Sequence, residues 1–225
     1  MSELTPVAKP GRRGRRVALI GGTALTLAVL GLVGYAQLEQ IHRFPPQQLT
    51  LEPVQAEGLI LDIGGGGEGV IGQLNGPQVV AIDIDERELL DAPPGPLKLV
   101  MDARKLTFVP DSFNTTTVFF TFMYIKGPDH ETVLQQIRRV LKPGGRLLIW
   151  DVNFRNRPPE KKYALFRYTA QLPGKQVSSG YGVSWPEGVQ DLGYWVALGE
   201  KAGFEAGVKK DTGAWFYLEL TKPRS

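Results

Sequence analysis

Short hydrophobic runs alternate with helix-like patterns along most of the chain. Runs that have the length and composition of buried strands occupy residues 59–63, 78–84, 97–101, 117–124 and 146–151. Before the fifth run, Val133, Ile137 and Leu141 recur at helical spacing, with Asp129 as the expected N-cap and Gly144 beyond the end. Such alternation is typical of βαβ units, so we expect an α/β fold with a doubly wound, mostly parallel sheet.

The C-terminal pattern adds a helix and a hairpin to this sheet. Apolar residues recur at helical spacing over residues 189–202, and Gly203 follows them. Residues 205–210 and 215–221 are strand-like, and the Asp-Thr-Gly sequence between them is typical of a tight turn. We therefore expect a seven-stranded sheet that ends in an antiparallel hairpin.

The first 57 residues have a different character. Residues 1–16 form a basic tail, and residues 17–36 carry no charge over about the ~20 residues that a helix needs to cross a bilayer. This run predicts one transmembrane helix that precedes the domain, with a cleaved signal peptide or a buried helix as alternatives. Residues 37–57 contain three prolines and predict an extended linker, so the globular domain is expected over residues 58–225.

Composition excludes several kinds of chemistry. The chain has no cysteine, so it has no disulfide, no thiolate nucleophile and no Cys-ligated zinc. Its two histidines, His42 and His130, lie far apart in sequence, and we expect no metal site. His130 falls in the first turn of a predicted helix, where a structural role is the simpler interpretation. The net charge of +3 comes largely from the basic tail, so we expect no nucleic-acid partner.

The stretch at residues 59–69 is the strongest candidate for a binding site. An apolar run ends in Asp62 and breaks into glycines. Gly64 and Gly66 can adopt positive φ and let a nucleotide-like ligand approach the main chain. Asp83 ends the next strand about 20 positions later, where a carboxylate can accept both hydroxyls of a ribose.

Two more motifs make the pattern specific. Met101-Asp102-Ala103 follows the third strand, and residues 141–149 read Leu-Lys-Pro-Gly-Gly-Arg-Leu-Leu-Ile. With the glycine stretch and Asp83, they resemble the class I S-adenosylmethionine-dependent methyltransferases of type 11, over about residues 58–223. The resemblance implies a Rossmann-like fold and S-adenosylmethionine as the cofactor.

The resemblance also implies a role for each matching position. The glycine turn would hold the amino-acid part of the cofactor, with Asp62 near its ammonium group. Asp83 would bind the ribose, and Asp102 with the amide of Ala103 would meet the adenine edge. The predicted cofactor-binding residues are Asp62, Gly64, Gly66, Asp83, Asp102 and Ala103.

One residue departs from the family pattern. The third glycine of the motif would fall at position 68, where this chain has Glu68, and a glycine follows at Gly69. The spacing of Gly64, Gly66 and Gly69 also fits Gly-x-Gly-x-x-Gly. An NAD(P)-dependent oxidoreductase is therefore the alternative enzyme.

Few catalytic residues are expected, because methyl transfer from a sulfonium depends mainly on positioning. Tyr124, after the fourth strand, and Asp151, at the end of the fifth, are the candidates on the acceptor side. Each is also explained by structure alone, since a buried tyrosine packs against its neighbours and an aspartate at a strand end caps the backbone.

Residues 153–185 form a basic, aromatic insertion that we expect to act as a lid and to select the methyl acceptor. Tyr163, Phe166 and Ala170 could share one face of a short helix at a membrane surface, or the aromatic residues could pack on the domain. With the run at 17–36, this predicts a small-molecule or lipid acceptor associated with a membrane.

Membrane topology leaves a further alternative open. The basic tail would place the N-terminus in the cytoplasm and the domain outside, whereas S-adenosylmethionine is cytosolic. We expect a single-pass membrane protein whose domain faces the cytoplasm. A non-catalytic, membrane-tethered binding module on a degenerate methyltransferase fold is the other possibility, and the oligomeric state is open.

Overall fold

The structure, a computed structural model, describes residues 39–224 of the chain. The chain divides into two units, Met1–Ile41 and His42–Ser225, and the second unit is described below. The basic tail and the hydrophobic run expected to form a helix at 17–36 lie outside the described residues. Within residues 39–224, no helix has the length and apolar character that a bilayer crossing requires.

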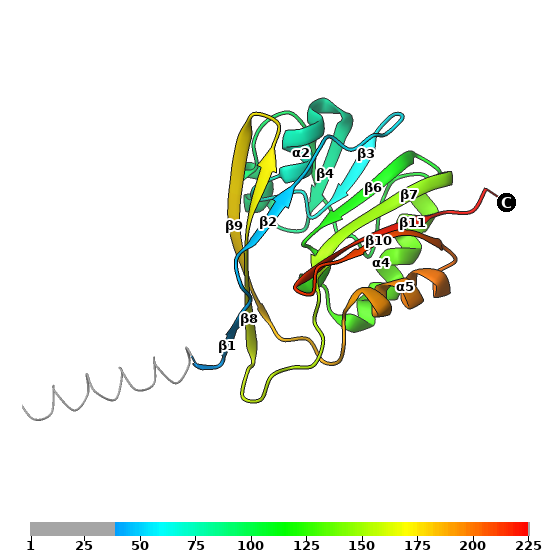
Figure 1. Cartoon of the computed structure of the whole chain (residues 1–225). Helices are drawn as coiled ribbons and strands as arrows, with labels where there is room; N and C mark the ends of the chain where they lie inside the picture. Colours follow the sequence, from blue (N-terminus) through cyan, green and yellow to red (C-terminus); the bar gives the residue numbers. More distant parts are fainter. Residues whose placement is uncertain (1–38, 225) are drawn as a thin grey trace, which may run out of the picture. The chain divides into compact units, whose positions relative to one another are not determined.

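A seven-stranded sheet forms the centre of the second unit, in the order β10-β11-β7-β6-β3-β4-β5 (Figure 1). The strands from β3 to β7 pair in parallel, whereas β11 is antiparallel to both β7 and β10. The predicted mostly parallel sheet with a C-terminal hairpin is confirmed. The strands are β3 (Ile60–Ile63), β4 (Val79–Asp83), β5 (Leu97–Val100), β6 (Phe113–Phe119), β7 (Leu141–Val152), β10 (Glu205–Asp211) and β11 (Trp215–Thr221).

Both faces of this sheet are covered, because neighbouring residues of each strand point to opposite sides. Ile60 joins the hydrophobic cluster on one face, and Leu61 joins the cluster on the other. The second cluster contains the apolar residues of the two longest helices, which lie together below the sheet in Figure 1. The helices are α2 (Val70–Asn75), α3 (Glu86–Asp91), α4 (Gly127–Val140) and α5 (Leu192–Lys201), with 3-10 turns η1 (Gly76–Gln78) and η2 (Phe122–Tyr124).

Helix α4 starts earlier than the sequence predicts. Lys126 is its N-cap, and Pro128 occupies the first turn, where the missing N–H of proline costs no hydrogen bond. Asp129 is therefore inside the helix instead of capping it, and its carboxylate accepts a hydrogen bond from Arg104 at 3.1 Å. The helix passes directly into β7 at Leu141.

The segment expected to be a linker contains two strands instead. They are β1 (Ile41–Arg43) and β2 (Gln47–Thr50), which belong to a second sheet of order β1-β8-β2, with β9 paired to β8. Leu49 and Leu51 are buried in the first cluster. The local sequence predicts a linker because Pro45 and Pro46 interrupt it, but β8 supplies the hydrogen-bonding partner for the residues on either side.

The insertion at 153–185 is a β-hairpin, so the predicted short helix is wrong. Its strands are β8 (Tyr163–Leu172) and β9 (Lys175–Ser184), which pair in antiparallel register. Burial alternates along β8 with a period of two, which places Tyr163 and Phe166 on opposite faces. Phe166 and Tyr168 pack in the same cluster as Ile60, so the aromatic residues of this lid pack mainly on the domain.

This alternation generates a stability prediction. Phe166→Ala should lower the free energy of unfolding by about 3–5 kcal/mol, because the side chain is 1% exposed in the core between the sheets. Tyr163→Ala should lower it by less than about 1 kcal/mol, since Tyr163 is 46% exposed. Urea denaturation of the two variants measures the difference, and equal losses would contradict the strand assignment.

Candidate functional site

A cleft of about 800 Å³ opens at the carboxyl ends of β3, β4 and β6. Parallel strands bring these ends to the same edge of a sheet, which is where α/β proteins bind their ligands. The floor of the cleft is formed by the residues at and after the ends of these strands, including Ile63 and Asp83. Ser179, Gly180 and Tyr181 of the lid strand β9 form part of its wall.

The glycine turn at the end of β3 is packed too closely for side chains. Gly64 has φ +71°, and a Cβ atom there would lie 2.3 Å from Oγ1 of Thr121. A Cβ atom on Gly66 would lie 2.5 Å from the Cβ atom of Glu88. Both glycines line the cleft. The expected positive φ is found at Gly64 but not at Gly66. Gly66 is therefore required by its close contact with α3, and Gly64 by both its φ and its contact with Thr121.

Glu68 fits into this turn because the left-handed residues lie on either side of it. Gly67 and Gly69 have φ values of +55° and +52°, whereas Glu68 is not among the described non-glycine residues with positive φ. Its carboxylate faces β9, where it accepts hydrogen bonds from the hydroxyls of Ser179, at 2.5 Å, and Tyr181, at 3.2 Å. Glu68, which occupies the position where the family pattern has glycine, thus connects the glycine turn to the lid.

Three of the other predicted cofactor residues also line the cleft: Asp83, Asp102 and Ala103. Asp83 ends β4, and its Oδ1 atom accepts the amide of Asp85 at 2.9 Å. Arg104 donates to both carboxylate oxygens of Asp102, which holds the pKa of Asp102 below its usual value. All three thus lie where a ligand in the cleft could contact them, and their roles in cofactor binding stay a prediction.

Asp62 is the exception among the predicted cofactor residues. Its side chain is 2% exposed, and it is not among the residues that line the cleft. Oγ1 of Thr117 donates to its Oδ1 atom at 2.7 Å, and a Cβ atom on Gly65 would lie 2.7 Å from its Oδ2 atom. Burial raises the pKa of Asp62 to about 7. Asp62 therefore supports the glycine turn from below, a position that does not favour the predicted contact with a ligand ammonium.

Of the two catalytic candidates, only Tyr124 reaches the cleft. Its side chain is 55% exposed and lines the cleft. The buried part of the side chain and the negative charge of nearby Asp151 raise its pKa to about 12, so it is a neutral hydroxyl at pH 7. Asp151 is 2% exposed and accepts the amides of Met123 at 3.3 Å and Val152 at 2.7 Å. It holds the turn η2 that carries Tyr124.

Desolvation raises the pKa of Asp151 to about 7.

His130 is also buried, and its ring nitrogens contact the carbonyl of Ile125 and the hydroxyl of Tyr194. Its structural interpretation agrees with this position. Among the described residues, no three histidine, aspartate or glutamate side chains are arranged so that they could hold a metal ion.

Aromatic side chains form the outer wall of the cleft. They are Phe119, Phe120, Tyr124 and Tyr181. The ring centroid of Tyr181 lies 6.0 Å from that of Phe120 and 6.3 Å from that of Tyr124. The sequence does not predict that Phe120 and Tyr181 belong to the site, because only the position of the hairpin over the sheet brings the lid and the end of β6 together.

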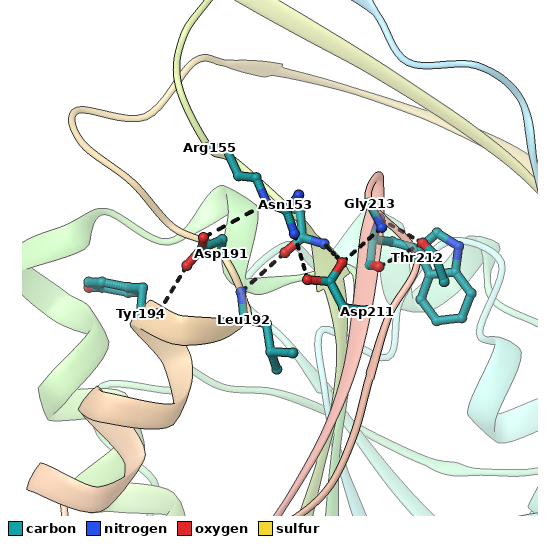
Figure 2. A network of polar contacts seen from close by, with 9 residues as sticks. Asn153, Arg155, Asp191, Leu192, Tyr194, Asp211, Thr212 and Gly213 are labelled. Carbon is teal, nitrogen blue, oxygen red and sulfur yellow. Dashed lines mark hydrogen bonds and ion pairs between the residues drawn. The ribbon is translucent and has the colours of Figure 1, made fainter.

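A polar network fixes the base of the lid (Figure 2). Asn153 accepts a hydrogen bond from the amide of Leu192 at 3.1 Å and donates one to Asp211 at 2.9 Å. Arg155 forms ion pairs with Asp211 at 2.5 Å and with Asp191 at 3.9 Å. These contacts join the chain leaving β7, the start of α5 and the turn between β10 and β11. The start of the lid insertion is therefore attached to the turn between β10 and β11 and to the segment at the start of α5, which follows the lid.

The charge around the glycine turn is negative. Glu68, Asp83 and Glu88 all line this part of the cleft, and burial together with the neighbouring carboxylates raises the pKa of Glu88. Arg104 and Lys126 are the basic residues among those that line the cleft, and Arg104 pairs with Asp102 and Asp129. Among the described residues, no salt bridge neutralises the carboxylates at the turn, so the turn favours a cationic ligand.

Residues 61–149 match the methyltransferase domain family. The demethylmenaquinone methyltransferase of Listeria welshimeri is 37% identical over 82 residues, which are 36% of this chain and 34% of that protein. The ubiquinone/menaquinone biosynthesis C-methyltransferase UbiE of Pseudomonas putida is 32% identical over 147 residues, 58% of this chain and 57% of that protein. The chain thus spans between a third and somewhat over half of the length of these relatives.

A solved structure extends the likeness to most of the domain. An S-adenosylmethionine-dependent methyltransferase of Methanosarcina mazei has a TM-score of 0.54 and 17% identity, with 77% of this chain and 96% of that chain covered. At this identity the likeness concerns the fold alone. The methyltransferase fold expected from the motifs is confirmed.

The two buried aspartates generate a prediction about pH. Both have a pKa of about 7 in the folded chain and an ordinary value near 4 in the unfolded chain. The folded protein therefore holds more protons between these values, and stability should fall as pH rises from about 4 to about 7. Asp62→Asn and Asp151→Asn should each reduce this slope by up to about 1.4 kcal/mol per pH unit.

Urea denaturation at several pH values measures these slopes. Asp91→Asn is the matched control, because Asp91 is exposed on α3 and lies outside the cleft. A slope unchanged in the Asp62 and Asp151 variants would show that their carboxyl groups ionise normally in the folded protein.

Proposed function

We propose that the protein is an S-adenosylmethionine-dependent methyltransferase. The observation that carries the proposal is the negative glycine turn at the carboxyl end of β3, with Glu68, Asp83 and Glu88 around it. S-Adenosylmethionine carries a sulfonium and an ammonium, so it brings positive charge to this position. The match of residues 61–149 to the methyltransferase domain family supports the same proposal.

The residues present fit this cofactor. The narrow glycine turn leaves the main chain open to the amino-acid part, and the carboxylate of Asp83 would accept the ribose hydroxyls. Asp102 and Ala103 would face the adenine. When bound, the cofactor supplies an electrophilic methyl group. The protein's contribution is to orient the acceptor and exclude water, which is what the lid and the aromatic wall provide.

An NAD(P)-dependent oxidoreductase is the weaker proposal. A dinucleotide places its pyrophosphate over the glycine turn, and Glu68 and Glu88 would repel those negative charges. The sheet also contains the reversed strand β11 between β7 and β10, whereas the dinucleotide-binding order is that of an open, mostly parallel sheet. A non-catalytic binding module would share the fold. Calorimetry separates the two cofactors, and a methylation assay separates an enzyme from a binding module.

Calorimetry of the full chain tests the choice of cofactor. S-Adenosylhomocysteine should bind and NAD should not. Asp83→Asn should weaken the binding of S-adenosylhomocysteine about tenfold or more, because an amide replaces a carboxylate that accepts charge-assisted hydrogen bonds. Asp91→Asn serves as the control, since it removes the same charge outside the cleft. Binding of neither compound would reject both enzyme proposals, and binding of NAD alone would reverse their order.

The aromatic wall indicates the class of acceptor. Rings of Phe119, Phe120, Tyr124 and Tyr181 favour a flat aromatic molecule beside the cofactor position. The Listeria relatives are named for demethylmenaquinone. We propose a quinone-type acceptor in its reduced form, because the ring carbon must donate the electron pair for the new C–C bond. As that bond forms, the bond from methyl carbon to sulfur would break with its electron pair left on S-adenosylhomocysteine, and the ring proton would be lost to solvent after the transfer.

Association of this acceptor with a membrane is the finer part of the proposal. It rests on the uncharged run at residues 17–36 and on the lipid-soluble character of such quinones. With that run in a bilayer and the domain on the cytoplasmic side, the cleft would have access to both the cytosolic cofactor and a membrane acceptor.

A methylation assay tests both parts. The full chain should add one methyl group to reduced demethylmenaquinone, detected by mass spectrometry, and should work faster when the acceptor is supplied in vesicles than in detergent. Tyr124→Phe should keep most of the activity, because the neutral hydroxyl is not required as a base. Tyr124→Ala should lower kcat/KM about tenfold through loss of the ring. A vesicle rate no higher than the detergent rate would contradict the membrane part.

A further inference from the structure

The position of Asp62 raises the question of which group receives the ammonium of the cofactor. Asp62 is buried and does not line the cleft, and a Cβ atom on Gly65 of the turn would approach its Oδ2 atom to 2.7 Å. A cation in the cleft would therefore need a different carboxylate. Glu68 is within the turn itself and lines the cleft.

The carboxylate of Glu68 is held in place. Oε1 accepts the hydroxyl of Ser179, and Oε2 accepts the hydroxyl of Tyr181 at 3.2 Å. The hydroxyl of Tyr181 also lies 3.0 Å from that of Tyr168, on the neighbouring strand β8. A carboxylate oxygen can accept more than one hydrogen bond, so each oxygen keeps capacity for a further donor. The two lid hydroxyls thus hold the carboxylate at the cleft without using all of its capacity to accept hydrogen bonds.

The charge of Glu68 has no cationic partner among the described residues, since none of their salt bridges includes it. Glu88 and Asp83 lie nearby and add to the negative potential. The rings of Tyr181 and Tyr124 line the same cleft, and aromatic faces attract cations. A protonated primary amine satisfies all three features, because it is positive, compact and has three N–H donors.

We propose that Glu68, held by Ser179 and Tyr181, receives the ammonium group of the cofactor's amino-acid end. The lid strand β9 is then part of the cofactor site as well as the acceptor site. The proposal rests on the proposed methyltransferase function. It also gives a reason for a carboxylate at a position where the family motif has glycine.

Two ligands that differ only at the amino group test the proposal. They are S-adenosylhomocysteine and its analogue in which hydrogen replaces the amino group, each titrated calorimetrically into the full chain. The unmodified protein should prefer S-adenosylhomocysteine about tenfold or more, as a charge-assisted hydrogen bond implies. Glu68→Gln should reduce this preference to about threefold or less, with little change for the analogue. Tyr181→Phe, which keeps the ring, should reduce the preference by a smaller factor.

Glu86→Gln is the control for net charge, because Glu86 is exposed and lies outside the cleft. It should leave the preference unchanged, and thermal unfolding should show that all variants are folded. If Glu68→Gln weakens both ligands equally, or neither, the proposal is wrong while the methyltransferase function stands. If neither ligand binds the unmodified protein, the proposed function fails and this inference fails with it.

An amine on the methyl acceptor would offer the same chemistry from a second source. Tyramine, an aromatic primary amine, distinguishes the two. Three results together would overturn the assignment to the cofactor and place Glu68 in the acceptor site. Tyramine would bind the unmodified chain, and Glu68→Gln would abolish that binding. The same variant would leave the preference between the two adenosine ligands unchanged.

Discussion

The close packing of the glycine turn against its neighbours is the constraint on which the site depends. The amides of Gly64 and Gly65 donate to the carbonyl of Ile82 at 2.8 and 3.0 Å, which attaches the turn to the end of β4. A side chain at Gly64 would collide with Thr121, the residue that leads into η2. The turn therefore fixes the distance between β3, β4 and the loop after β6. Because those three strands run in parallel, their ends form one continuous floor for a ligand.

Two buried carboxyl groups support this floor from below. Asp62 contacts the glycine turn and Asp151 holds the turn that carries Tyr124, so each acts on the cleft through the backbone above it. Both are almost completely buried, and for both desolvation is the main reason that the pKa is raised to about 7. Ionisation of Asp62 or Asp151 should therefore lower the stability of the same segments that shape the cleft.

The lid hairpin is part of a second sheet that packs on the main sheet. This second sheet, made of β1, β2, β8 and β9, covers the face of the main sheet opposite α4 and α5, in a layer where α/β folds commonly place helices. The network around Asn153 and Asp211 attaches the base of the lid, and Glu68 contacts its strand β9. The lid is connected to the main sheet at both places, so it can position an acceptor against the glycine turn without a separate domain.

The sequence by itself determined the order along the chain of the strands in the main sheet, the C-terminal hairpin, the glycine turn and the ends of strands at which Asp83 and Asp102 lie. Each depends on local periodicity or on the end of a strand, which neighbouring residues reveal. The sequence misplaced one strand: the run at 117–124 predicts a strand to Tyr124, whereas β6 spans Phe113–Phe119 and Phe122–Tyr124 form the turn η2. Only the tertiary structure decided that the presumed linker pairs with β8, that Asp62 lies under the turn, and that Glu68 meets Ser179, 111 residues further along the chain. A local pattern shows which residues face a neighbour, but the identity of that neighbour depends on how distant segments pack together.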